Sequence, residues 1–542
     1  MNILVIGAVA AGTKAAAKLK RELGSEAEVT VLTKSKDISY AGCGLPYYIG
    51  GVVGKRSELV VNTPQSYGNL TGVKVLTGME ALKLDAAAKK VTAKNVDTDE
   101  ESVYSYDKLI IATGAAPFVP KLEGADLAGV HVLRTPDDAD AIIADVNAGA
   151  KRAVVIGGGY IGLEVAENLT AKGLRVSVIE MLPHIMPGFD ADFADFAENH
   201  LADQKIMVFT GDPVVSLEGE NGHVTKVHTG KRAFKADLVL MSVGIRPATK
   251  WLEGSGIEMF KGTVCVDEFM RSNLEDVYAV GDCATAKNFV TQQGSWSPMG
   301  STANIQGRIC ARAIAGTAVH GYRGFLGTAI VQLPGLNCAK TGLSDDAAKK
   351  AGFEVCSATL AADSRAHFMP GTDVSIIRLT ADKNTHKLLG AQVMGGYGVD
   401  KLIDIAVTAI TMGAAAEDLE DMDLAYAPPF ATALDAFTVA VNVLVDKLNG
   451  LLVGGTLEEA NRRTGWVKLD VGKSPVNPKL PYHPVEKING PIEGIPFDAP
   501  ILLFCAKGKN SYLAQVKLRN LGYTDTFVLE GGVTFYPQAL DE

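Results

Sequence analysis

The chain has 542 residues and a formal net charge of −10, with 47% hydrophobic and 21% charged residues. Such proportions are typical of a globular protein, and the length predicts about three or four domains. The net negative charge disfavours nucleic acids as partners, and no apolar stretch reaches the roughly 18 residues that suggest a membrane span.

The cysteines are odd in number, widely scattered and without a CxxC pair. This spacing predicts neither a disulfide framework nor a zinc site, and we predict no metal site elsewhere. Reduced thiols are typical of the cytoplasm, where we expect the protein to act. The seven cysteines are Cys43, Cys265, Cys283, Cys310, Cys338, Cys356 and Cys505.

A dinucleotide-binding motif opens the chain. Residues 2–7 predict a buried strand, Gly7 to Gly12 a turn, and residues 13–23 a helix whose first amide groups face a diphosphate. Val9 replaces the middle glycine of the usual G-x-G-x-x-G pattern. The next strand ends at Thr33, where an acidic residue usually binds the ribose, and Lys34 follows as a candidate cofactor contact.

Cys43 lies in the run S-Y-A-G-C-G-L-P-Y-Y, which begins at Ser39. The glycines on both sides allow the backbone to approach a flat ring, and Pro46 suits the first turn of a helix. A helix start lowers the pKa of a thiol, so we expect Cys43 to work as a thiolate. The alternative is a small buried hydrophobic residue, for which flanking glycines and proline are unusual.

A second dinucleotide motif follows at residues 153–162, with all three glycines, Gly157, Gly159 and Gly162. The next predicted strand ends at Glu180. A carboxylate at this place accepts hydrogen bonds from both ribose hydroxyls and repels a 2′-phosphate. The sequence therefore predicts NADH as the preferred nucleotide over NADPH.

Two further buried strands end in residues suited to a cofactor. The first ends in the small residues Ala112, Thr113 and Gly114, and the second ends at Asp282, which can accept the hydroxyls of a ribityl chain. A tight turn at Gly114 and a helix N-cap at Asp282 are the alternatives. Residues 241–247 predict a return crossing between two domains. Gly244, in this crossing, and Ala303 complete the candidate cofactor contacts.

The order of these motifs resembles the flavoprotein disulfide reductases with two dinucleotide folds, over about residues 1–445. Cys43, the one cysteine of its motif, resembles the active-site cysteine in the branch of coenzyme A-disulfide reductases, NADH oxidases and persulfide reductases. The resemblance implies an α/β fold with two nested Rossmann-like domains and an α+β dimerisation domain, and therefore a homodimer. The implied domains are an FAD domain (1–112 and 245–320), an NAD(H) domain (113–244) and the dimerisation domain (321–448).

The resemblance also assigns roles to single residues. Tyr160 would gate the nicotinamide pocket beside Ile161, and Glu164 would point towards the flavin. A core aromatic and a solvated helix carboxylate are the alternatives. Tyr426, in the run L-A-Y-A-P-P-F, would reach the partner's cysteine and act as a general acid, unless it is a packed aromatic in a proline-stiffened turn.

Other residues are candidates for contacts with coenzyme A. His367 stands near a position where relatives carry a tyrosine, and it could protonate a leaving sulfur, although a lone histidine is often structural. Lys18 and Arg21 are three residues apart on one helix face, where they could bind a phosphate or simply face solvent. Ser39 is a candidate contact for the pantetheine arm.

The tail resembles a rhodanese domain, a small α/β domain at residues 464–542 that follows a predicted linker at 449–463. A predicted strand ends at Cys505, and the loop up to Ser511 could aim several N–H groups at one sulfur and so stabilise a persulfide. Asn510 replaces the usual arginine. The alternative is a degenerate domain kept for packing or docking.

Together these features predict a reductase of sulfur–sulfur bonds that contains FAD and uses NADH. Tyr48 stands where a dithiol enzyme of this architecture has its second cysteine, so Cys43 must take a partner sulfur from a substrate or be oxidised itself. The expected substrates are coenzyme A disulfide, coenzyme A persulfide or polysulfide, with coenzyme A bound as substrate or mixed disulfide. The alternatives are an NADH oxidase or peroxidase that uses a sulfenic acid, and a non-catalytic redox sensor or sulfur-carrier module.

Overall fold

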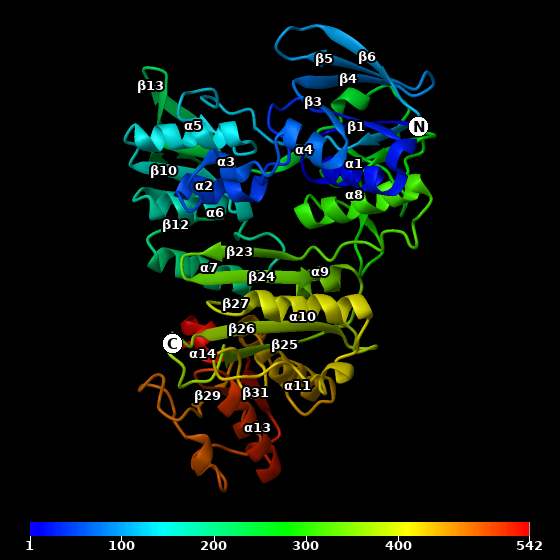
Figure 1. Ribbon diagram of the computed structural model, residues 1–542. Coiled ribbons are helices and arrows are strands. Elements are labelled where there is room, and N and C mark those ends of the chain that lie inside the picture. Colours follow the sequence, from blue (N-terminus) through cyan, green and yellow to red (C-terminus); the bar gives the residue numbers. More distant parts are fainter. Residues whose placement is uncertain (541–542) are drawn as a thin grey trace. The chain divides into compact units, whose positions relative to one another are not determined.

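The computed structural model describes residues 1–540, which divide into two units (Figure 1). The first unit comprises Met1–Ile185 and Lys205–Phe325, and it contains both glycine-rich motifs. The second unit comprises Met186–Gln204 and the chain from Leu326 onward. The two units are described separately below.

The first parallel sheet of the first unit carries the N-terminal motif. Its strand order is β20-β7-β1-β2-β3, and all neighbouring strands are parallel. Ile3 and Val5 pack on the side of helices α1 and α8, whereas Leu4 and Ile6 pack on the opposite side, so both faces are buried. The elements are β1 (Asn2–Ile6), α1 (Ala10–Leu23), β2 (Glu28–Leu32), β3 (Lys74–Leu76), β7 (Lys108–Ile111), β20 (Val277–Ala279) and α8 (Gly300–Ala315).

A second sheet of the same design is inserted into the first fold. Its strand order is β12-β11-β10-β16-β9, again all parallel. Two short antiparallel strands, β8 (Ala115–Pro117) and β17 (Ile245–Pro247), pair where the chain leaves the first fold and returns to it. The elements are β9 (Val130–His131), α5 (Pro136–Asn147), β10 (Arg152–Ile156), α6 (Tyr160–Ala171), β11 (Arg175–Ile179), β12 (Met207–Phe209) and β16 (Leu238–Met241).

Short helices and antiparallel sheets complete the first unit. The helices α2 (Leu45–Gly50), α3 (Arg56–Leu59) and α4 (Pro64–Thr71) follow β2. One three-stranded sheet consists of β4 (Met79–Asp85), β5 (Lys90–Asn95) and β6 (Glu101–Ser105), and another of β13 (Val214–Glu220), β14 (His223–Thr229) and β15 (Ala233–Lys235). Two-stranded pairs are formed by β18 (Met259–Phe260) with β19 (Thr263–Val264) and by β21 (Ala286–Lys287) with β22 (Gly294–Ser295).

The second unit contains a five-stranded antiparallel sheet, which we call the interface sheet, in the order β23-β24-β27-β26-β25. Helix α10 packs against β24 and β27, and α11 packs against β25 and β26. Helix α11 starts at Ala436, where the Asp435 carboxylate caps it by accepting from the N–H of Phe437. The elements are α7 (Ala191–Asp203), β23 (Ala329–Leu333), β24 (Leu336–Gly342), α9 (Asp345–Lys350), β25 (Val355–Asp363), β26 (Val374–Asp382), β27 (Leu388–Gly395), α10 (Val399–Met412) and α11 (Ala436–Leu448).

The tail forms a small parallel α/β sheet in the order β28-β31-β30-β29. Residues 449–463, expected to be a linker, contain β28 and α12, and β28 is an edge strand of this sheet. The elements are β28 (Gly454–Gly455), α12 (Leu457–Asn461), β29 (Val467–Asp470), β30 (Ile501–Phe504), α13 (Lys509–Leu521), β31 (Thr526–Leu529) and α14 (Gly532–Phe535). The predicted α/β class with two nested Rossmann-like folds is confirmed, whereas the rhodanese likeness of the tail stays a prediction.

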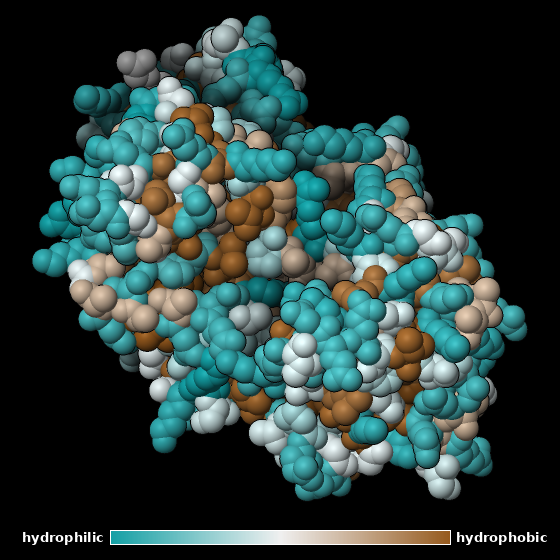
Figure 2. Space-filling view, turned by 90° about the horizontal axis from the view of Figure 1, so that it is seen from above, coloured by the Kyte–Doolittle hydropathy of each residue, from teal (hydrophilic) through white to brown (hydrophobic). Residues whose placement is uncertain are grey.

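Figure 2 shows a face on which hydrophilic residues prevail and hydrophobic residues form patches between them. Within residues 1–540, every helix is too short or too polar to cross a bilayer.

Two buried polar clusters join the tail to the interface sheet. In the first, Asp192 of α7 binds Arg378 of β26 at 2.6 Å and accepts a hydrogen bond from the Tyr536 hydroxyl at 2.6 Å. In the second, Glu530 pairs with Lys447 at 2.6 Å and accepts from the N–H of Thr359 at 2.9 Å. Because buried charges are tolerated only when they are paired, these contacts fix how the tail docks on the sheet.

We expect Tyr536→Phe to destabilise the second unit. The change leaves the half-buried Asp192 carboxylate one donor short, a loss of about 1 kcal/mol. Calorimetry should show a lower transition temperature than for the wild type. Tyr482→Phe is the control, because Tyr482 is 37% exposed and bonds only the carbonyl of Lys473 among the described residues. Equal transition temperatures for the two variants would contradict the docking role of Tyr536.

Candidate active site

The two glycine motifs form the same turn in the structure, although Val9 interrupts the first. A side chain at Gly12 would overlap the carbonyl oxygen of Gly7, and a side chain at Gly162 would overlap that of Gly157. Both helices therefore pack on the turn before them only because these positions are glycine. Around Gly159 the space within 4 Å of an added Cβ is free of described atoms, which leaves room for a ligand.

Helices α1 and α6 begin without a side-chain cap among the described residues, and their first turns carry no acidic residue. By contrast, α5 is capped by Thr135 and carries two aspartates in its first turn. Uncapped N–H groups at the start of a helix bind a diphosphate. The two turns thus fit two dinucleotides, as the sequence predicts.

The ends of β7 and β20 meet beside the first turn. The N–H of Gly281 donates to Gln306 at 2.7 Å, and the buried Ala303 lies next to Gly281. The Asp282 side chain is largely buried, and burial raises its pKa, which the charge of Arg134 opposes from 3.7 Å. The predicted residues Ala112, Thr113 and Gly114 follow β7 directly, where the first sheet ends.

Arg134 was missed by the sequence analysis. It precedes α5, and its charge lowers the pKa of Asp282, Cys43 and Tyr40. A cation at this place suits an anionic group of a cofactor bound beside Asp282. An isolated arginine before a helix carries no recognisable sequence signal.

The two ribose positions differ as expected. Glu180 is buried, and its carboxylate accepts from the N–H of Gly158 at 2.7 Å and of Leu182 at 2.8 Å, which leaves lone pairs for hydroxyl donors. Thr33 is buried at the end of β2, and Lys34 pairs with Glu80 at 2.9 Å.

Cys43 lies in a single 3₁₀ turn (Gly42–Gly44) directly before α2, and it is exposed. Helix α2 packs against α6, and a side chain at Gly50 would overlap the amide of Asn168. The Tyr48 hydroxyl donates to Asp140 of α5 at 2.9 Å. The cysteine of the first fold is thereby held against two helices of the second.

The expectation that a helix start lowers the pKa of Cys43 is wrong for the protein alone. Partial burial, followed by the charges of Glu164 and Asp282, raises this pKa, and Arg134 opposes them only in part. Helix α2 has six residues, so its dipole is small compared with two nearby carboxylates.

Two carboxyl groups of α6, Glu164 and Glu167, are three residues apart on one side of the helix and form what we call the acidic pair. The charge of Glu164 acts on the Cys43 thiol. The Tyr47 hydroxyl lies 3.3 Å from Glu164. Burial raises the pKa of both glutamates to about 7. Oε2 of Glu167 is buried and lacks a hydrogen-bond partner among the described residues. The sequence analysis did not identify Tyr47 or Glu167. Their spacing was available in the sequence: Tyr47 comes four residues after Cys43, and Glu167 comes three residues after Glu164.

Some predicted site residues of the first unit already bind other residues of the chain. Lys18 forms an ion pair with Glu22, whereas Arg21 is exposed. Ser39 has a positive φ of 48° and donates its N–H to the carbonyl of Ala8 at 2.9 Å, which ties the Cys43 run to the first glycine turn. Tyr160 and Ile161 start α6, and Gly244 follows β16.

The other predicted catalytic residues belong to the second unit. Tyr426 is 51% exposed, and His367 is exposed with its ring 5.4 Å from that of Phe368. Cys505 is buried, and its sulfur accepts from the N–H of Gly508 at 3.2 Å. Lys507 of the same loop pairs with Asp363 of β25 at 2.5 Å.

Ser511, which the sequence analysis placed in the Cys505 loop without a role for its side chain, lies in the first turn of α13. Its hydroxyl oxygen is buried and has no hydrogen-bond partner within residues 1–540. A buried hydroxyl normally has a hydrogen-bond partner, so the Ser511 hydroxyl is suited to bind a group held at the loop.

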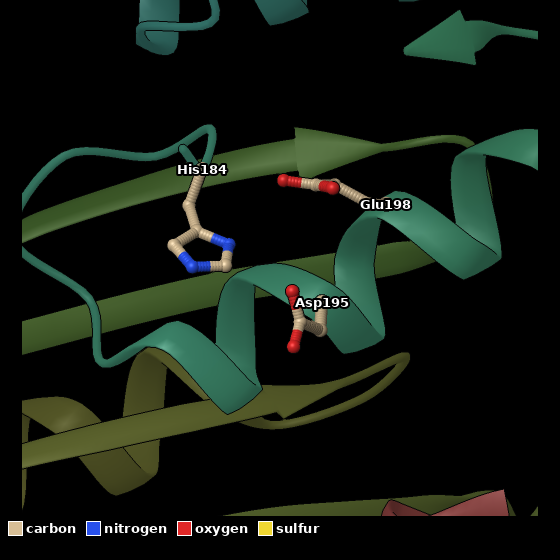
Figure 3. Close-up of side chains that lie close together, drawn as sticks. All are labelled: His184, Asp195 and Glu198. Carbon is tan, nitrogen blue, oxygen red and sulfur yellow. The ribbon is translucent and has the colours of Figure 1, made fainter. Parts of the chain in front are cut away.

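Figure 3 shows Asp195 and Glu198 on α7 and His184 in the loop that precedes this helix. Each carries a ligand atom suited to a metal ion. Because His184 belongs to the first unit and the two acids to the second, we assign no metal site to these residues.

We expect Glu167→Gln to stabilise the protein at pH 8 and to have little effect at pH 5. The pKa of Glu167 rises from 4.5 to about 7 on folding, so the folded state loses stability as pH rises through this window. Glutamine removes that loss. Transition temperatures at both pH values test the prediction, with the exposed Glu220→Gln as control. A variant that is destabilised more at pH 8 than at pH 5 would contradict it.

Comparison with known families identifies two regions. Residues 1–306 match the family model "Pyridine nucleotide-disulphide oxidoreductase", and residues 329–437 match the dimerisation domain of the same family. A Methanocaldococcus jannaschii protein named NADH oxidase is 32% identical over 451 residues, 83% of this chain and 100% of its own length. A Pyrococcus abyssi NAD(P)H sulfur oxidoreductase (CoA-dependent) is 33% identical over 82% of this chain and 98% of its own.

Two solved structures match nearly the whole chain. Reduced Bacillus anthracis CoADR-RHD has a TM-score of 0.95 at 31% identity and covers 100% of this chain and 98% of its own. A NAD-dependent persulfide reductase from A. fulgidus has a TM-score of 0.94 at 34% identity over 99% of this chain and 100% of its own. The two nucleotide turns, the single cysteine between them and these matches lead to one conclusion: the chain belongs to the pyridine nucleotide-disulphide oxidoreductase family and is an oxidoreductase.

Proposed function

We propose that this protein is an FAD-containing, NADH-dependent reductase of sulfur–sulfur bonds, with Cys43 as the residue that captures the substrate sulfur. One observation carries the proposal: Cys43 directly precedes α2, and α2 packs against α6, the helix that follows the second glycine turn. Consistent with this place, the charges of Asp282, at the end of the first fold, and of Glu164, on α6, both act on the thiol. The thiol therefore lies where a cofactor of the first fold meets one of the second.

The residues of the first fold fit FAD. The uncapped start of α1 would hold the diphosphate, Asp282 would accept ribityl hydroxyls, and Arg134 would face an anionic group. When bound, the flavin would pass two electrons from the nicotinamide to a sulfur–sulfur bond. Glu180 at the end of β11 would select NADH, because its buried charge repels a 2′-phosphate.

The substrate must supply the second sulfur, because Tyr48 occupies the place of a second cysteine and bonds Asp140 instead. The Cys43 thiolate attacks the substrate disulfide, its sulfur bonds to one substrate sulfur, and the other sulfur leaves with the electron pair and takes a proton. Two electrons from NADH then cleave the mixed disulfide, which frees Cys43 and a second thiol.

The relatives point to coenzyme A as the thiol that carries the sulfur. Proteins named coenzyme A disulfide reductase and coenzyme A polysulfide/persulfide reductase are 31–33% identical to this chain. Arg21 is an available cation for a phosphate, whereas Lys18 would first have to leave Glu22. We therefore propose coenzyme A disulfide, persulfide or polysulfide as the substrate class.

The dimerisation model and the exposed Tyr426 support a homodimer in which Tyr426 assists the partner's cysteine, with His367 as a second proton donor. All seven cysteines are free, which is consistent with a reducing compartment such as the cytoplasm. A relative named NADH oxidase favours one alternative, oxidation of Cys43 to a sulfenic acid during reduction of oxygen or peroxide.

We expect Cys43→Ser to lose coenzyme A disulfide reduction by several orders of magnitude, because no other thiol is placed to form the mixed disulfide. The rate of NADH oxidation with coenzyme A disulfide, coenzyme A persulfide or oxygen as acceptor measures the loss. In the wild type, the rate with NADH should exceed the rate with NADPH. Cys265→Ser is the control thiol change. Wild-type disulfide turnover in Cys43→Ser would overturn the proposal, and turnover with oxygen alone would favour the oxidase.

We propose that Cys505 carries sulfane sulfur in the tail. The N–H of Gly508 already donates to its sulfur, and the unpartnered Ser511 hydroxyl offers a second donor to a terminal sulfur. Both groups would stabilise a persulfide anion. The positive charge of the loop is reduced in two ways: Asn510 replaces the usual arginine, and Lys507 pairs with Asp363.

Incubation with a sulfane-sulfur donor followed by mass spectrometry tests this role. We expect wild-type protein to gain one sulfur atom at Cys505, Ser511→Ala to gain less, and Cys505→Ser to gain none there. Cys356→Ser is the control, because Cys356 lies in β25 outside the loop. Equal labelling of Cys505 in the wild type and in Ser511→Ala would show that the hydroxyl does not stabilise the persulfide. An unlabelled Cys505 in the wild type would contradict the carrier role.

A further inference from the structure

Residues 530–536 of the tail, which we call the docking segment, have contacts on two sides. The segment follows β31 and contains α14. On one side it binds the Cys505 loop, and on the other it binds the interface sheet and the helices α7 and α11. Because the segment is only seven residues long, its position on one side constrains its position on the other.

On the side of the loop, backbone hydrogen bonds hold the two residues that begin it. The N–H groups of Val533 and Thr534 donate to the carbonyls of Cys505 and Ala506 at 3.1 and 3.0 Å. Gly532 has a φ of +62°, and a Cβ there would lie 2.4 Å from the carbonyl oxygen of Cys505 and 2.5 Å from that of Ala506. Only glycine therefore lets the docking segment reach the loop.

The same hydrogen bonds orient the donors of the loop. In a trans peptide the C=O and the following N–H point in opposite directions, so fixing the carbonyls of Cys505 and Ala506 turns the next two N–H groups away from the docking segment. The N–H of Gly508, which comes after them, donates to the Cys505 sulfur at 3.2 Å. The loop thus holds a shape in which its donors face a sulfur.

On the other side, the docking segment is anchored outside the tail. The buried Glu530 carboxylate pairs with Lys447 of α11 at 2.6 Å and accepts from the N–H of Thr359 of β25 at 2.9 Å. The ring of Phe535 packs against that of Phe193 of α7, with 4.9 Å between the centroids. The place of the docking segment is therefore determined by elements that do not belong to the tail sheet.

We propose that the docking segment positions the Cys505 loop for sulfur binding, and that it does so only while Glu530 anchors it to the interface sheet. Glu530 and Gly532 are positioning residues, because they act on the sulfur through the loop. The tail is then not an independent sulfur carrier but one whose loop is shaped by the interface sheet. This inference rests on the proposed carrier role of Cys505.

The step that depends on this position is the transfer of one sulfur atom. The Cys505 thiolate attacks the terminal sulfur of coenzyme A persulfide, a new sulfur–sulfur bond forms, and that of the coenzyme A persulfide breaks. Coenzyme A leaves with the electron pair and takes the proton of the transferred sulfur, which leaves a persulfide anion on Cys505. Charge-assisted hydrogen bonds from the loop stabilise this anion, and a displaced loop loses them.

The test measures the sulfur-transfer equilibrium of the full-length protein with coenzyme A persulfide and coenzyme A at a fixed ratio. The parent is Cys43→Ser, which removes the thiol proposed to react with the same substrate. Mass spectrometry of the peptide that contains Cys505 gives the fraction that carries sulfur, and hence the equilibrium constant.

In Gly532→Ala we expect the equilibrium constant to fall at least roughly tenfold, the effect of losing one hydrogen bond to a charged group. Gly522→Ala is the matched control in the same tail. Gly522 also has a positive φ, +102°, but the nearest atom to an added Cβ belongs to the Phe497 ring, at 3.8 Å.

Glu530→Gln breaks the anchor instead of the contact with the loop. The amide oxygen can accept from Lys447 or Thr359, but the NH₂ group is itself a donor and cannot serve the other. We expect a fall of roughly tenfold here as well, again the weight of one charge-assisted hydrogen bond. The sign is diagnostic, because removal of a negative charge by itself favours an anion and predicts a rise. Glu458→Gln, at an exposed position of α12, is the control for charge.

An unchanged constant in either variant, or a rise in Glu530→Gln, would overturn the positioning role. Calorimetry verifies that each variant keeps the unfolding transition of the second unit. The two variants break different sides of the docking segment, so the second remains a test if the first does not fold. A parent protein without sulfur on Cys505 would overturn the carrier role itself, and this inference with it.

Discussion

The packing of α2 on α6 is the contact on which the candidate site depends. It brings the cysteine of the first nucleotide fold against the helix that follows the second glycine turn, and it requires a glycine at position 50, whose missing side chain makes room for Asn168. Close packing of this kind tolerates little change in volume. The reactive thiol, the start of α6 and the acidic pair are thereby assembled from segments more than 100 residues apart.

The same contact determines the electrostatics of the site. Glu164 and Glu167 are half-hidden from water because α2 lies over α6, and burial of a carboxyl group disfavours its charged form. Partial burial, followed by the charge of Glu164, in turn raises the pKa of Cys43.

The tail is a firmly docked part of the second unit rather than a tethered one. Tyr536 and Glu530 place polar atoms inside the protein, where they bind Asp192 and Lys447 of the interface region. The M. jannaschii protein matches over its full length but covers only 83% of this chain. In this chain the Cys505 loop is instead tied to β25 by the pairing of Lys507 with Asp363.

The sequence by itself determined the fold class, both glycine turns, Glu180 and the single cysteine, because strand periodicity and glycine spacing are local properties of the chain. Helix limits were less certain: α1 begins at Ala10 rather than Thr13. The pKa of Cys43 and the roles of Arg134, Tyr47 and Ser511 needed the tertiary structure. These properties arise from burial and from charges that are distant in sequence, and neither a helix start nor a motif contains that information.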